Sequence, residues 1–556
     1  MKGLKPSWLL ALGLLSLLPG LGLKDPWPAD EPRFVLLAEE MLASGNWLIP
    51  SRAGELYPDK PPVFMWLEAA TLGATGSIRL AHQLPSLLAA ILVLLLTFDL
   101  GRRLWNRRVG LWAAGVLMVT VQFVLQSRSG QIDGTLCLFT TLGLYGLLRH
   151  ALLGPAWGFY FLGFAAMGVG VMTKGVGILP ALALIPIALA GARGWKGSIP
   201  PHGGRWWLGP LVMLGVLALW AVPLWLYVQH SGDPDLLAYR DNLFFRQTVE
   251  RYAQSWGHLK PPWYYLVSVI PWAWLPVSLA LPWLIPAWRR RLARRDARYL
   301  VLLGWVVLVV VFFSLSSGKR GVYLLPATPA LALAVAPLAP GLWRRRSLNR
   351  AGFALAALLA AAFSFGTFQT EKLAEQGMPP LSAPLAVAAL LAVASLVVAR
   401  PRKGLVALLG TLVAVWVVLG LWVVPKIDPY RSGRQLMLDL EEAMPPEGEV
   451  MIVQWREQMI LHAARTVVHF GYHPPGEEQA RWAASWLAQA PAGSRVLVPE
   501  RFLSPCFEPS GEVLGTFHRR DWYLAGPQAL TGACTGETAP RTFRYDRAFG
   551  RRSGRK

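Results

Sequence analysis

Long apolar runs separated by short polar segments fill the chain up to about residue 424. Most of these runs hold about 17–25 residues, which is enough to cross a bilayer as a tilted helix. On this pattern we predict about thirteen membrane-spanning helices. They cover residues 7–23, 83–99, 109–127, 134–150, 156–173, 176–192, 206–228, 263–287, 299–316, 322–342, 351–368, 383–399 and 404–424. The pattern therefore predicts a polytopic α-helical membrane protein.

The composition agrees with this prediction. Of 556 residues, 54% are hydrophobic and only 15% are charged, whereas soluble domains carry roughly 25% charged residues. The formal net charge is +22. The basic residues gather between apolar runs, at 102–108, 289–298, 344–350 and 400–403. This is the pattern of cytoplasmic loops, and no soluble basic domain is present, so we expect no nucleic-acid partner.

The basic loops also predict the orientation. Lys2 and Lys5 place the N-terminus in the cytoplasm, and no Ala-x-Ala-like cleavage site precedes Asp25, so we expect the first run to remain as an anchor. With an odd number of spans, the segment from about residue 425 then lies on the far side. In a bacterium that is the periplasm.

Beyond residue 424 the long apolar runs end and the charge rises. Residues 450–454, 466–470 and 494–498 read as strands, and 436–443 and 477–490 as helices, which predicts a small α/β domain. We therefore divide the chain into a membrane domain (1–424), an α/β domain (425–540) and a basic tail (541–556). Cys506 and Cys534 either pair in the periplasm or remain as two thiols.

The first outer loop, 24–82, carries the most distinctive charged residues. Residues 32–44 read as a short amphipathic helix that Gly45 ends, and 61–72 as a second one. We expect Phe34, Leu37, Met41 and Leu42 to lie on the bilayer surface. Asp30 and Glu31 precede the first of these helices. They are either capping residues or carboxylates that face a substrate.

Further along this loop, Lys60 stands in the turn Tyr57-Pro-Asp-Lys-Pro-Pro, next to Asp59. The prolines stiffen the backbone, which favours binding of a fixed anion at low entropic cost. The alternative is a surface turn with a solvated lysine.

Other outer segments add charged groups. Asp133 follows Arg128, and we expect the two to pair. Lys174 either neutralises a head-group phosphate or, as we favour, extends to the membrane surface. The segment 244–265 combines Arg246, Arg251, His258 and Lys260 with aromatic residues, and it either contacts a lipid head group or anchors the chain at the interface. Lys319, Arg320 and Tyr323 break the positive-inside pattern, which suggests an anionic ligand. Since Lys174 is the one ambiguous charge near mid-span, interfacial chemistry is favoured over transport.

Several of these segments together carry a family resemblance. In order they are Asp-Glu-Pro-Arg (30–33), Glu-Met-Leu-x-Ser-Gly-x-Trp-Leu-x-Pro (40–50), Asp-Lys-Pro-Pro (59–62), Asp133, Met-Thr-Lys-Gly (172–175), the loop from Arg251 through His258 to Pro-Pro-Trp-Tyr-Tyr, and Ser-Gly-Lys-Arg-x-x-Tyr-Leu-Leu-Pro (317–326). They resemble the bacterial lipid A aminoarabinose transferases, which are related to protein O-mannosyltransferases and belong to the GT-C glycosyltransferases. The resemblance covers about residues 1–430.

The resemblance implies the GT-C fold and roles for individual residues. Asp30 and Asp133 match the family's catalytic carboxylates. Residues that match positions associated with the donor phosphate are Tyr57, Lys60, Arg251 and Tyr323. We add Glu31, Asp59, Arg128, His258 and Lys319 as supporting residues. Thr248 stands where the family often has a metal-ligating His, so we assign no metal ligand and expect no required cofactor, with a structural divalent metal as the alternative.

The implied reaction is an inverting transfer of a sugar, 4-amino-4-deoxy-L-arabinose or a related one, from undecaprenyl phosphate to lipid A. Asp30 is expected to deprotonate the acceptor, while the cations stabilise the departing phosphate. One alternative is a protein O-mannosyltransferase or another lipopolysaccharide sugar transferase. A second is a lipid or sugar transporter. We expect the protein to lie in the inner membrane, to contact membrane lipids and to act on a periplasmic acceptor.

Overall fold

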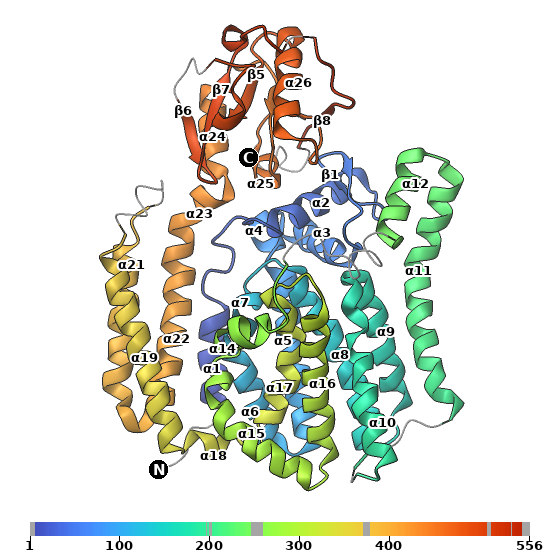
Figure 1. The fold of residues 1–556 in the computed structure, drawn as a ribbon, viewed down its shortest axis with the longest axis vertical. Coiled ribbons are helices and arrows are strands. Elements are labelled where there is room, and N and C mark those ends of the chain that lie inside the picture. The colour runs from blue at the N-terminus through green and yellow to red at the C-terminus, as the bar shows by residue number, and fades with distance from the viewer. Residues whose placement is uncertain are drawn as a thin grey trace.

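A bundle of apolar helices carries a small α/β domain at one end (Figure 1). The computed structural model describes residues 6–195, 197–198, 203–245, 259–370, 379–508, 513–534 and 536–547. In Figure 1 the α/β domain stands above α2, α3 and α4, and the α15 and α18 segments lie at the opposite end.

The bundle is built from many short and long helical segments. They are α1 (Pro6–Leu17), α5 (Leu84–Leu104), α6 (Arg107–Met118), α7 (Val121–Ser127), α8 (Ile132–Leu153), α9 (Trp157–Thr173), η1 (Gly175–Ala183), α10 (Leu184–Ala192), η2 (Gly204–Trp207), α11 (Leu208–Ser231), α12 (Pro234–Asp241), η4 (Tyr265–Val269), α14 (Ile270–Ala273), α15 (Val277–Ala293), α16 (Ala297–Leu315), η5 (Gly321–Ala327), α17 (Thr328–Val335), α18 (Ala339–Trp343), α19 (Arg346–Thr367), α21 (Ser382–Ala399), η6 (Pro401–Lys403), α22 (Gly404–Val418), η7 (Leu419–Val423) and α23 (Val424–Ser432).

Not every predicted span is a straight helix long enough to cross a membrane. Among the described residues, 8 helical segments are long and apolar enough, and up to 10 if each bent pair counts as one span. The predicted spans 109–127 and 263–287 are the bent pairs, with angles of 70° and 108°. Pro276 lies at the second break, where a proline cannot continue the hydrogen bonds of the helix. The runs at 7–23, 156–173 and 322–342 form shorter apolar helices within α1, α9 and η5–α17.

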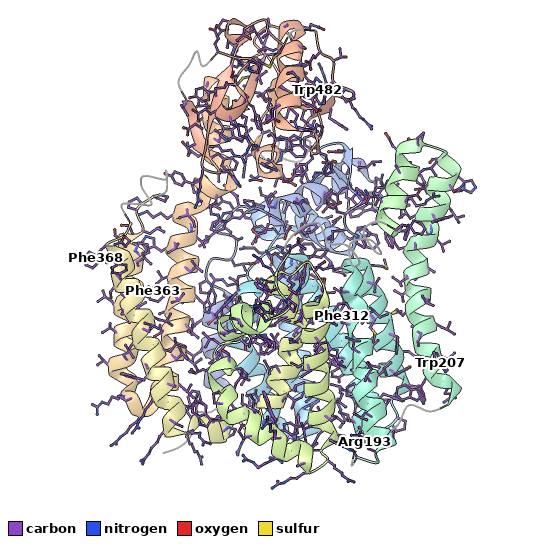
Figure 2. The ribbon with its side chains drawn as sticks, viewed as in Figure 1. Arg193, Trp207, Phe312, Phe363, Phe368 and Trp482 are labelled. Atoms are coloured by element: carbon purple, nitrogen blue, oxygen red, sulfur yellow. A yellow bond between two sulfur atoms is a disulfide. The ribbon has the colours of Figure 1, made fainter. Side chains whose placement is uncertain are left out.

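The outer surface of the bundle is apolar. Leu219, Leu315 and Val398 are 79%, 81% and 81% exposed. Phe312 and Phe368 also point away from the helices (Figure 2). Large apolar side chains exposed over the whole bundle indicate that its surroundings are lipid rather than water.

The α/β domain contains a six-stranded mixed sheet in the order β6-β7-β5-β3-β4-β8. Its strands are β3 (Val450–Ile452), β4 (Val467–His469), β5 (Arg495–Pro499), β6 (Val513–Phe517), β7 (Arg520–Ala525) and β8 (Phe543–Tyr545), and its helices are α24 (Arg434–Ala443), α25 (Glu457–His462) and α26 (Gly476–Gln489). Strand β3 pairs in parallel with β4 and β5, and the other pairs are antiparallel. The three predicted strands and two predicted helices are confirmed.

One feature of this domain differs from the prediction. Strand β8 lies at the start of the segment predicted as a basic tail, where it pairs antiparallel with β4 and forms one edge of the sheet. Cys506 and Cys534 form a disulfide, which settles the alternative that the sequence left open.

The first loop forms part of the core of the α/β domain rather than a surface layer on the bilayer. It contains α2 (Glu31–Ser44), β1 (Ser51–Arg52), β2 (Glu55–Leu56), α3 (Val63–Thr75) and α4 (Ile78–Ala81). The predicted helix is confirmed, and Gly45 ends it with φ 73°. However, Phe34, Leu37 and Met41 are buried against α3 and α8, and Val35 and Leu36 pack on the α/β domain. Because both faces of α2 are covered by protein, the predicted position on the bilayer is wrong.

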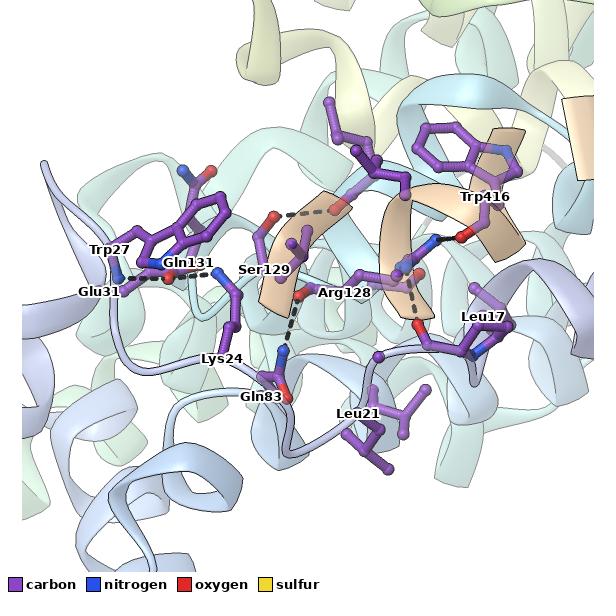
Figure 3. Close-up of a pocket in the computed structure, with 18 of the residues that line it drawn as sticks. Leu17, Leu21, Lys24, Trp27, Glu31, Gln83, Arg128, Ser129, Gln131 and Trp416 are labelled. Atoms are coloured by element: carbon purple, nitrogen blue, oxygen red, sulfur yellow. Dashed lines mark hydrogen bonds and ion pairs between the residues drawn. The ribbon is translucent and has the colours of Figure 1, made fainter. Parts of the chain in front are cut away.

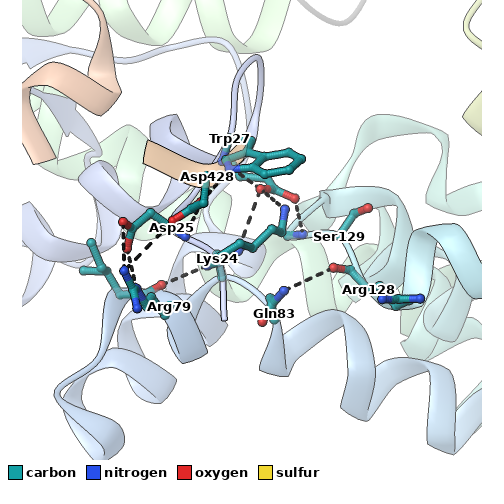
Figure 4. A network of polar contacts seen from close by, with 12 residues as sticks. Lys24, Asp25, Trp27, Arg79, Gln83, Arg128, Ser129 and Asp428 are labelled. Carbon is teal, nitrogen blue, oxygen red and sulfur yellow. Dashed lines mark hydrogen bonds and ion pairs between the residues drawn. The ribbon is translucent and has the colours of Figure 1, made fainter. Parts of the chain in front are cut away.

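Polar contacts fix the α/β domain to this loop and to α23 (Figure 4). Asp428 Oδ1 accepts hydrogen bonds from the Asp25 backbone N–H at 2.9 Å and from Trp27 Nε1 at 2.7 Å. Asp25 forms an ion pair with Arg79 at 2.7 Å and lies 3.6 Å from Arg434 of the domain. The loop, the last helix of the bundle and the α/β domain are therefore joined at one point.

Close helix packing generates a prediction about stability. A Cβ atom added to Gly146 in α8 would lie 2.8 Å from Gly163 Cα in α9 and even closer to the Phe159 carbonyl oxygen. Gly146→Ala should therefore lower the free energy of unfolding by about 1–3 kcal/mol, as overpacking does. Thermal unfolding of the purified chain in detergent measures the effect.

The control is Gly158→Ala in α9, where an added Cβ would meet no atom within 4 Å. It should leave the melting temperature unchanged or raise it slightly, because alanine favours a helix. Equal effects of the two substitutions would contradict the packing seen here.

Candidate active site

Asp30 lies at the start of α2, but its side chain caps no backbone N–H of that helix. Instead, its Oδ2 accepts a hydrogen bond from Arg320 Nη2 at 2.9 Å. Its Oδ1 lies 3.8 Å from Arg33 Nη1. The capping alternative is therefore wrong for this side chain, which two guanidinium groups orient.

These cations also determine the charge of Asp30. Burial alone raises the pKa of its carboxyl, but the charge and hydrogen bond of Arg320, together with Arg33 and Lys174, outweigh burial and lower the pKa below its usual value. Asp30 is therefore an ionised carboxylate at neutral pH, which is the form a general base requires.

Asp133 reaches the same cluster from the first turn of α8. Its Oδ1 forms an ion pair with Lys174 Nζ at 2.6 Å, and the Lys174 ammonium lies 4.5 Å from the centre of the Tyr323 ring. The predicted extension of Lys174 to the membrane surface is wrong, because α9 ends at Thr173 and the lysine turns toward a buried carboxylate. The structure thus brings Asp30, Asp133 and Tyr323 together.

We predicted that Arg128 pairs with Asp133, and this prediction is wrong. The Arg128 guanidinium donates to three backbone carbonyl groups, those of Ser16, Pro19 and Trp416. The difference arises because Arg128 precedes α8 and points back toward α1 and α22, whereas Asp133 lies inside the first turn of α8.

Tyr57 lies near Arg33, whereas the hydrogen bond of Lys60 stays within its own turn. Tyr57 is 1% exposed and packs with Phe34 and Phe64. Burial raises the pKa of its hydroxyl, and the charge of Arg33 acts in the opposite direction. Lys60 is half-buried, and its Nζ donates to the Asp59 carbonyl oxygen at 2.9 Å within the proline-rich turn. Arg251, His258 and Thr248 lie outside the described residues.

Glu31 points away from Asp30. Its Oε2 pairs with Lys24 at 2.5 Å and accepts from the Trp27 N–H at 2.8 Å, while Oε1 accepts from the Gly130 N–H at 3.0 Å. Consecutive residues of a helix point about 100° apart, so the two carboxylates lie in different surroundings. Glu31 joins the first loop to the segment before α8.

Lys319 also forms hydrogen bonds with groups close to it. It is 4% exposed and donates to the backbone carbonyl groups of Lys260, at 2.9 Å, and Ser316. Its neighbour Arg320 contacts Asp30 instead. Among the described residues, no group of three His, Cys, Asp or Glu side chains could hold a metal ion.

The α/β domain reaches the site through Glu457, which sequence reasoning missed. Glu457 Oε1 accepts from Arg33 Nε at 3.0 Å and from Arg52 Nη1 at 3.4 Å. Arg33 therefore lies between Glu457 and Asp30. Glu457 and Arg33 are 424 positions apart, and no local pattern marks the glutamate. Arg33 belongs to the Asp-Glu-Pro-Arg motif and Lys174 to the Met-Thr-Lys-Gly motif, so the sequence had already singled out these two residues.

The sequence resembles several known proteins. Residues 59–220 match the dolichyl-phosphate-mannose-protein mannosyltransferase family model. The chain is 34% identical over 355 residues to an undecaprenyl phosphate-α-4-amino-4-deoxy-L-arabinose arabinosyl transferase of Sodalis glossinidius. It is 33% identical over 337 residues to one of Pseudomonas fluorescens. These matches span 60% and 59% of this chain, and 60% and 58% of the two relatives.

The fold is also shared with solved structures. ArnT from Cupriavidus metallidurans bound to undecaprenyl phosphate superposes with a TM-score of 0.73 at 21% identity, over 96% of this chain and 98% of that chain. The apo oligosaccharyltransferase of Archaeoglobus fulgidus gives 0.50 at 12% identity, over 90% and 70% of the two chains.

The chain therefore shares the fold of ArnT, and its sequence resembles the aminoarabinose transferases over about 60% of its length. The predicted resemblance and fold class are thereby confirmed. The apolar helices identify a multi-pass membrane protein.

The contact of Glu457 with two arginines generates a second prediction. The side chains of Glu457 and Arg52 are each 4% exposed, and that of Arg33 is 20% exposed. Glu457→Gln should therefore lower the free energy of unfolding by about 3–5 kcal/mol, because it leaves the buried guanidinium charge of Arg52 without its carboxylate. Chemical or thermal unfolding of the full chain measures this.

Glu441→Gln is the matched control, because Glu441 is 41% exposed and pairs with Arg465 at 2.6 Å in the same domain. An exposed pair contributes less than about 1 kcal/mol. If both variants lose the same small amount, Glu457 does not hold the domain to the first loop.

Proposed function

We propose that this protein is an inverting glycosyltransferase of the inner membrane. It moves 4-amino-4-deoxy-L-arabinose, or a related sugar, from undecaprenyl phosphate to lipid A. The names of the relatives and of the undecaprenyl phosphate-bound ArnT support the donor and the sugar. The observation that carries the proposal is the ionised Asp30, held by Arg320 beside the Asp133–Lys174 pair.

The reaction follows from these charges. Asp30 takes the proton from the acceptor hydroxyl while its oxygen attacks the anomeric carbon. The bond from that carbon to the donor phosphate oxygen breaks, and its electron pair leaves with the phosphate. Lys60, Arg251, Tyr57 and Tyr323 donate hydrogen bonds to this phosphate, whose negative charge grows as it departs. Asp133 orients the acceptor from the other side of Lys174. We keep Glu31, Asp59, Arg128, His258 and Lys319 as supporting residues of this reaction.

The site lies on the periplasmic side, with the N-terminus in the cytoplasm and the α/β domain in the periplasm. Two observations support this orientation. The basic cluster at 289–298 runs from the end of α15 into α16, and that at 344–350 runs from the end of α18 into α19. Both lie at the end opposite the α/β domain (Figure 1). The Cys506–Cys534 disulfide fits an oxidising compartment. The membrane domain then covers residues 1–424 and the periplasmic domain begins at 425.

A protein acceptor is the second candidate. The observation that favours it is the match of residues 59–220 to the protein mannosyltransferase model. Mass spectrometry of lipid A and of periplasmic proteins, from cells that express or lack the chain, separates the two acceptors. A mass increment on lipid A that depends on the chain supports our proposal, and an increment on proteins alone contradicts it.

Replacing the base should abolish transfer. Asp30→Asn removes proton acceptance, so we expect turnover to fall by about 10²–10⁴-fold. Binding of polyprenyl phosphate should persist, because Lys60 and Tyr323 remain. The purified chain with lipid-linked sugar provides the rate. Asp439→Asn in α24, a partly exposed position whose Oδ1 accepts a hydrogen bond from Gln435, should retain full activity. Near-full activity of Asp30→Asn would remove Asp30 from the base role.

The pH dependence of activity should reveal the effect of Arg320 on the pKa of Asp30. Activity requires ionised Asp30, so it is lost as the pH falls through the pKa of this carboxyl. Since Arg320 lowers that pKa, Arg320→Gln should move the acidic limb of kcat/KM to higher pH. The control Arg465→Gln removes a cation that pairs with Glu441 instead and should leave the limb in place. An acidic limb unchanged by Arg320→Gln would show that another group controls it.

A further inference from the structure

A cavity of about 350 Å³ is lined by Glu31 but not by its neighbour Asp30. It is enclosed by the end of α1, the loop before α2, the start of α5, the segment between α7 and α8, and the helices from α22 to α23 (Figure 3). The proposed transfer reaction uses none of its walls directly.

Arg128 supplies a cation to this cavity. Its Nη1 donates to the carbonyl oxygens of Ser16 at 3.2 Å and Trp416 at 3.0 Å, and its Nη2 to that of Pro19 at 2.6 Å. Burial lowers the pKa of Arg128 to about 10, so it stays charged at neutral pH. In the described part of the chain no carboxylate forms an ion pair with it. Three carbonyl dipoles hold the guanidinium without neutralising its charge.

Lys24 and Arg431 add two more cations around Trp27. Lys24 Nζ lies 4.9 Å and Arg431 Cζ 4.8 Å from the centre of the Trp27 ring. Glu31 is the one carboxylate among the described residues that line the cavity. Its oxygens are already bonded to Lys24 and to the backbone N–H groups of Trp27 and Gly130. The lining therefore carries net positive charge.

Leucines form the other walls. Leu17, Leu21, Leu125 and Leu419 line the cavity, and Leu14, Leu15 and Leu18 of the adjoining α1 segment are 48%, 54% and 48% exposed. On the opposite side, the adjoining α22–α23 segment exposes Trp422 and Tyr430. Exposed leucines followed by Trp and Tyr are typical of the level where hydrocarbon meets head groups. The cavity thus combines cations with apolar walls at the membrane surface.

Glycines allow two segments to approach each other closely beside Arg128. A Cβ atom on Gly420 would collide with Arg128 Nη2 and with the Pro19 carbonyl, and Gly20 faces the Gly420 backbone. The end of α1 and the start of η7 can therefore approach closely enough for their carbonyl groups to hold one guanidinium.

We propose that this cavity binds the phosphate-bearing head of an anionic lipid, whose chains lie along the leucines of α1 and the adjoining α22–α23 segment. Arg128, Arg431 and Lys24 face the phosphate. The occupant is either a bulk anionic phospholipid or the acceptor lipid, since both present a phosphate beside acyl chains. This site is separate from the donor phosphate site at Lys60.

Native mass spectrometry of the full chain in detergent tests the proposal. The probes are phosphatidylglycerol, lipid A and inorganic phosphate, with phosphatidylcholine as the neutral lipid. Arg431→Gln and Arg128→Gln should each weaken binding of anionic lipid about tenfold, or about 1.4 kcal/mol, and leave phosphatidylcholine unaffected. Arg431 is exposed, so its substitution does not endanger the fold. Lys426→Gln, on the same helix α23 but outside the cavity, is the matched control.

The outcomes are distinct. Loss of lipid A alone assigns the site to the acceptor, and loss of both anionic lipids assigns it to membrane phospholipid. Competition by inorganic phosphate shows that the head group is recognised. Equal binding by wild type and both arginine variants, or an equal loss in Lys426→Gln, overturns the proposal. Unchanged binding of polyprenyl phosphate in Arg431→Gln separates this site from the donor site, so a failure here leaves the proposed transfer reaction intact.

Discussion

The placement of two arginines against one half-buried carboxylate, that of Asp30, is the constraint on which the rest of the structure depends. Burial raises the pKa of the Asp30 carboxyl, and Arg320 and Arg33 outweigh it and keep the carboxyl ionised. Arg320 comes from the segment before η5, and Arg33 from α2. The charge of the proposed base is therefore fixed only when distant parts of the bundle and the first loop are folded together.

Glu457 extends this constraint to the α/β domain. By binding both Arg33 and Arg52, it connects a domain that lies above the bundle (Figure 1) to the side chain that orients Asp30. The core of that domain is completed by Val35 and Leu36 of α2. This explains why an amphipathic helix in the first loop is buried by protein on both faces, and it gives the α/β domain a role in holding the site.

The sequence predicted the helical bundle, the end of α2 at Gly45 and three central strands, because apolar periodicity and glycine are local signals. It also marked Asp30, Asp133 and Tyr323, which the structure places in one cluster. It did not predict that Asp30 and Glu31 diverge, since that depends on the rotation of α2. The partners of Asp133 and Arg33 were also missed. Lys174 and Glu457 become neighbours of these residues only through packing between segments far apart in the chain.

The most direct test of the central claim is an experimental structure of the full chain with a polyprenyl phosphate-linked sugar bound. Our account predicts the donor phosphate at Lys60 and Tyr323, with the anomeric carbon facing the Asp30 carboxylate and the isoprenoid extending into the membrane. A donor phosphate bound on the opposite side of the membrane, or a sugar remote from Asp30, would contradict it.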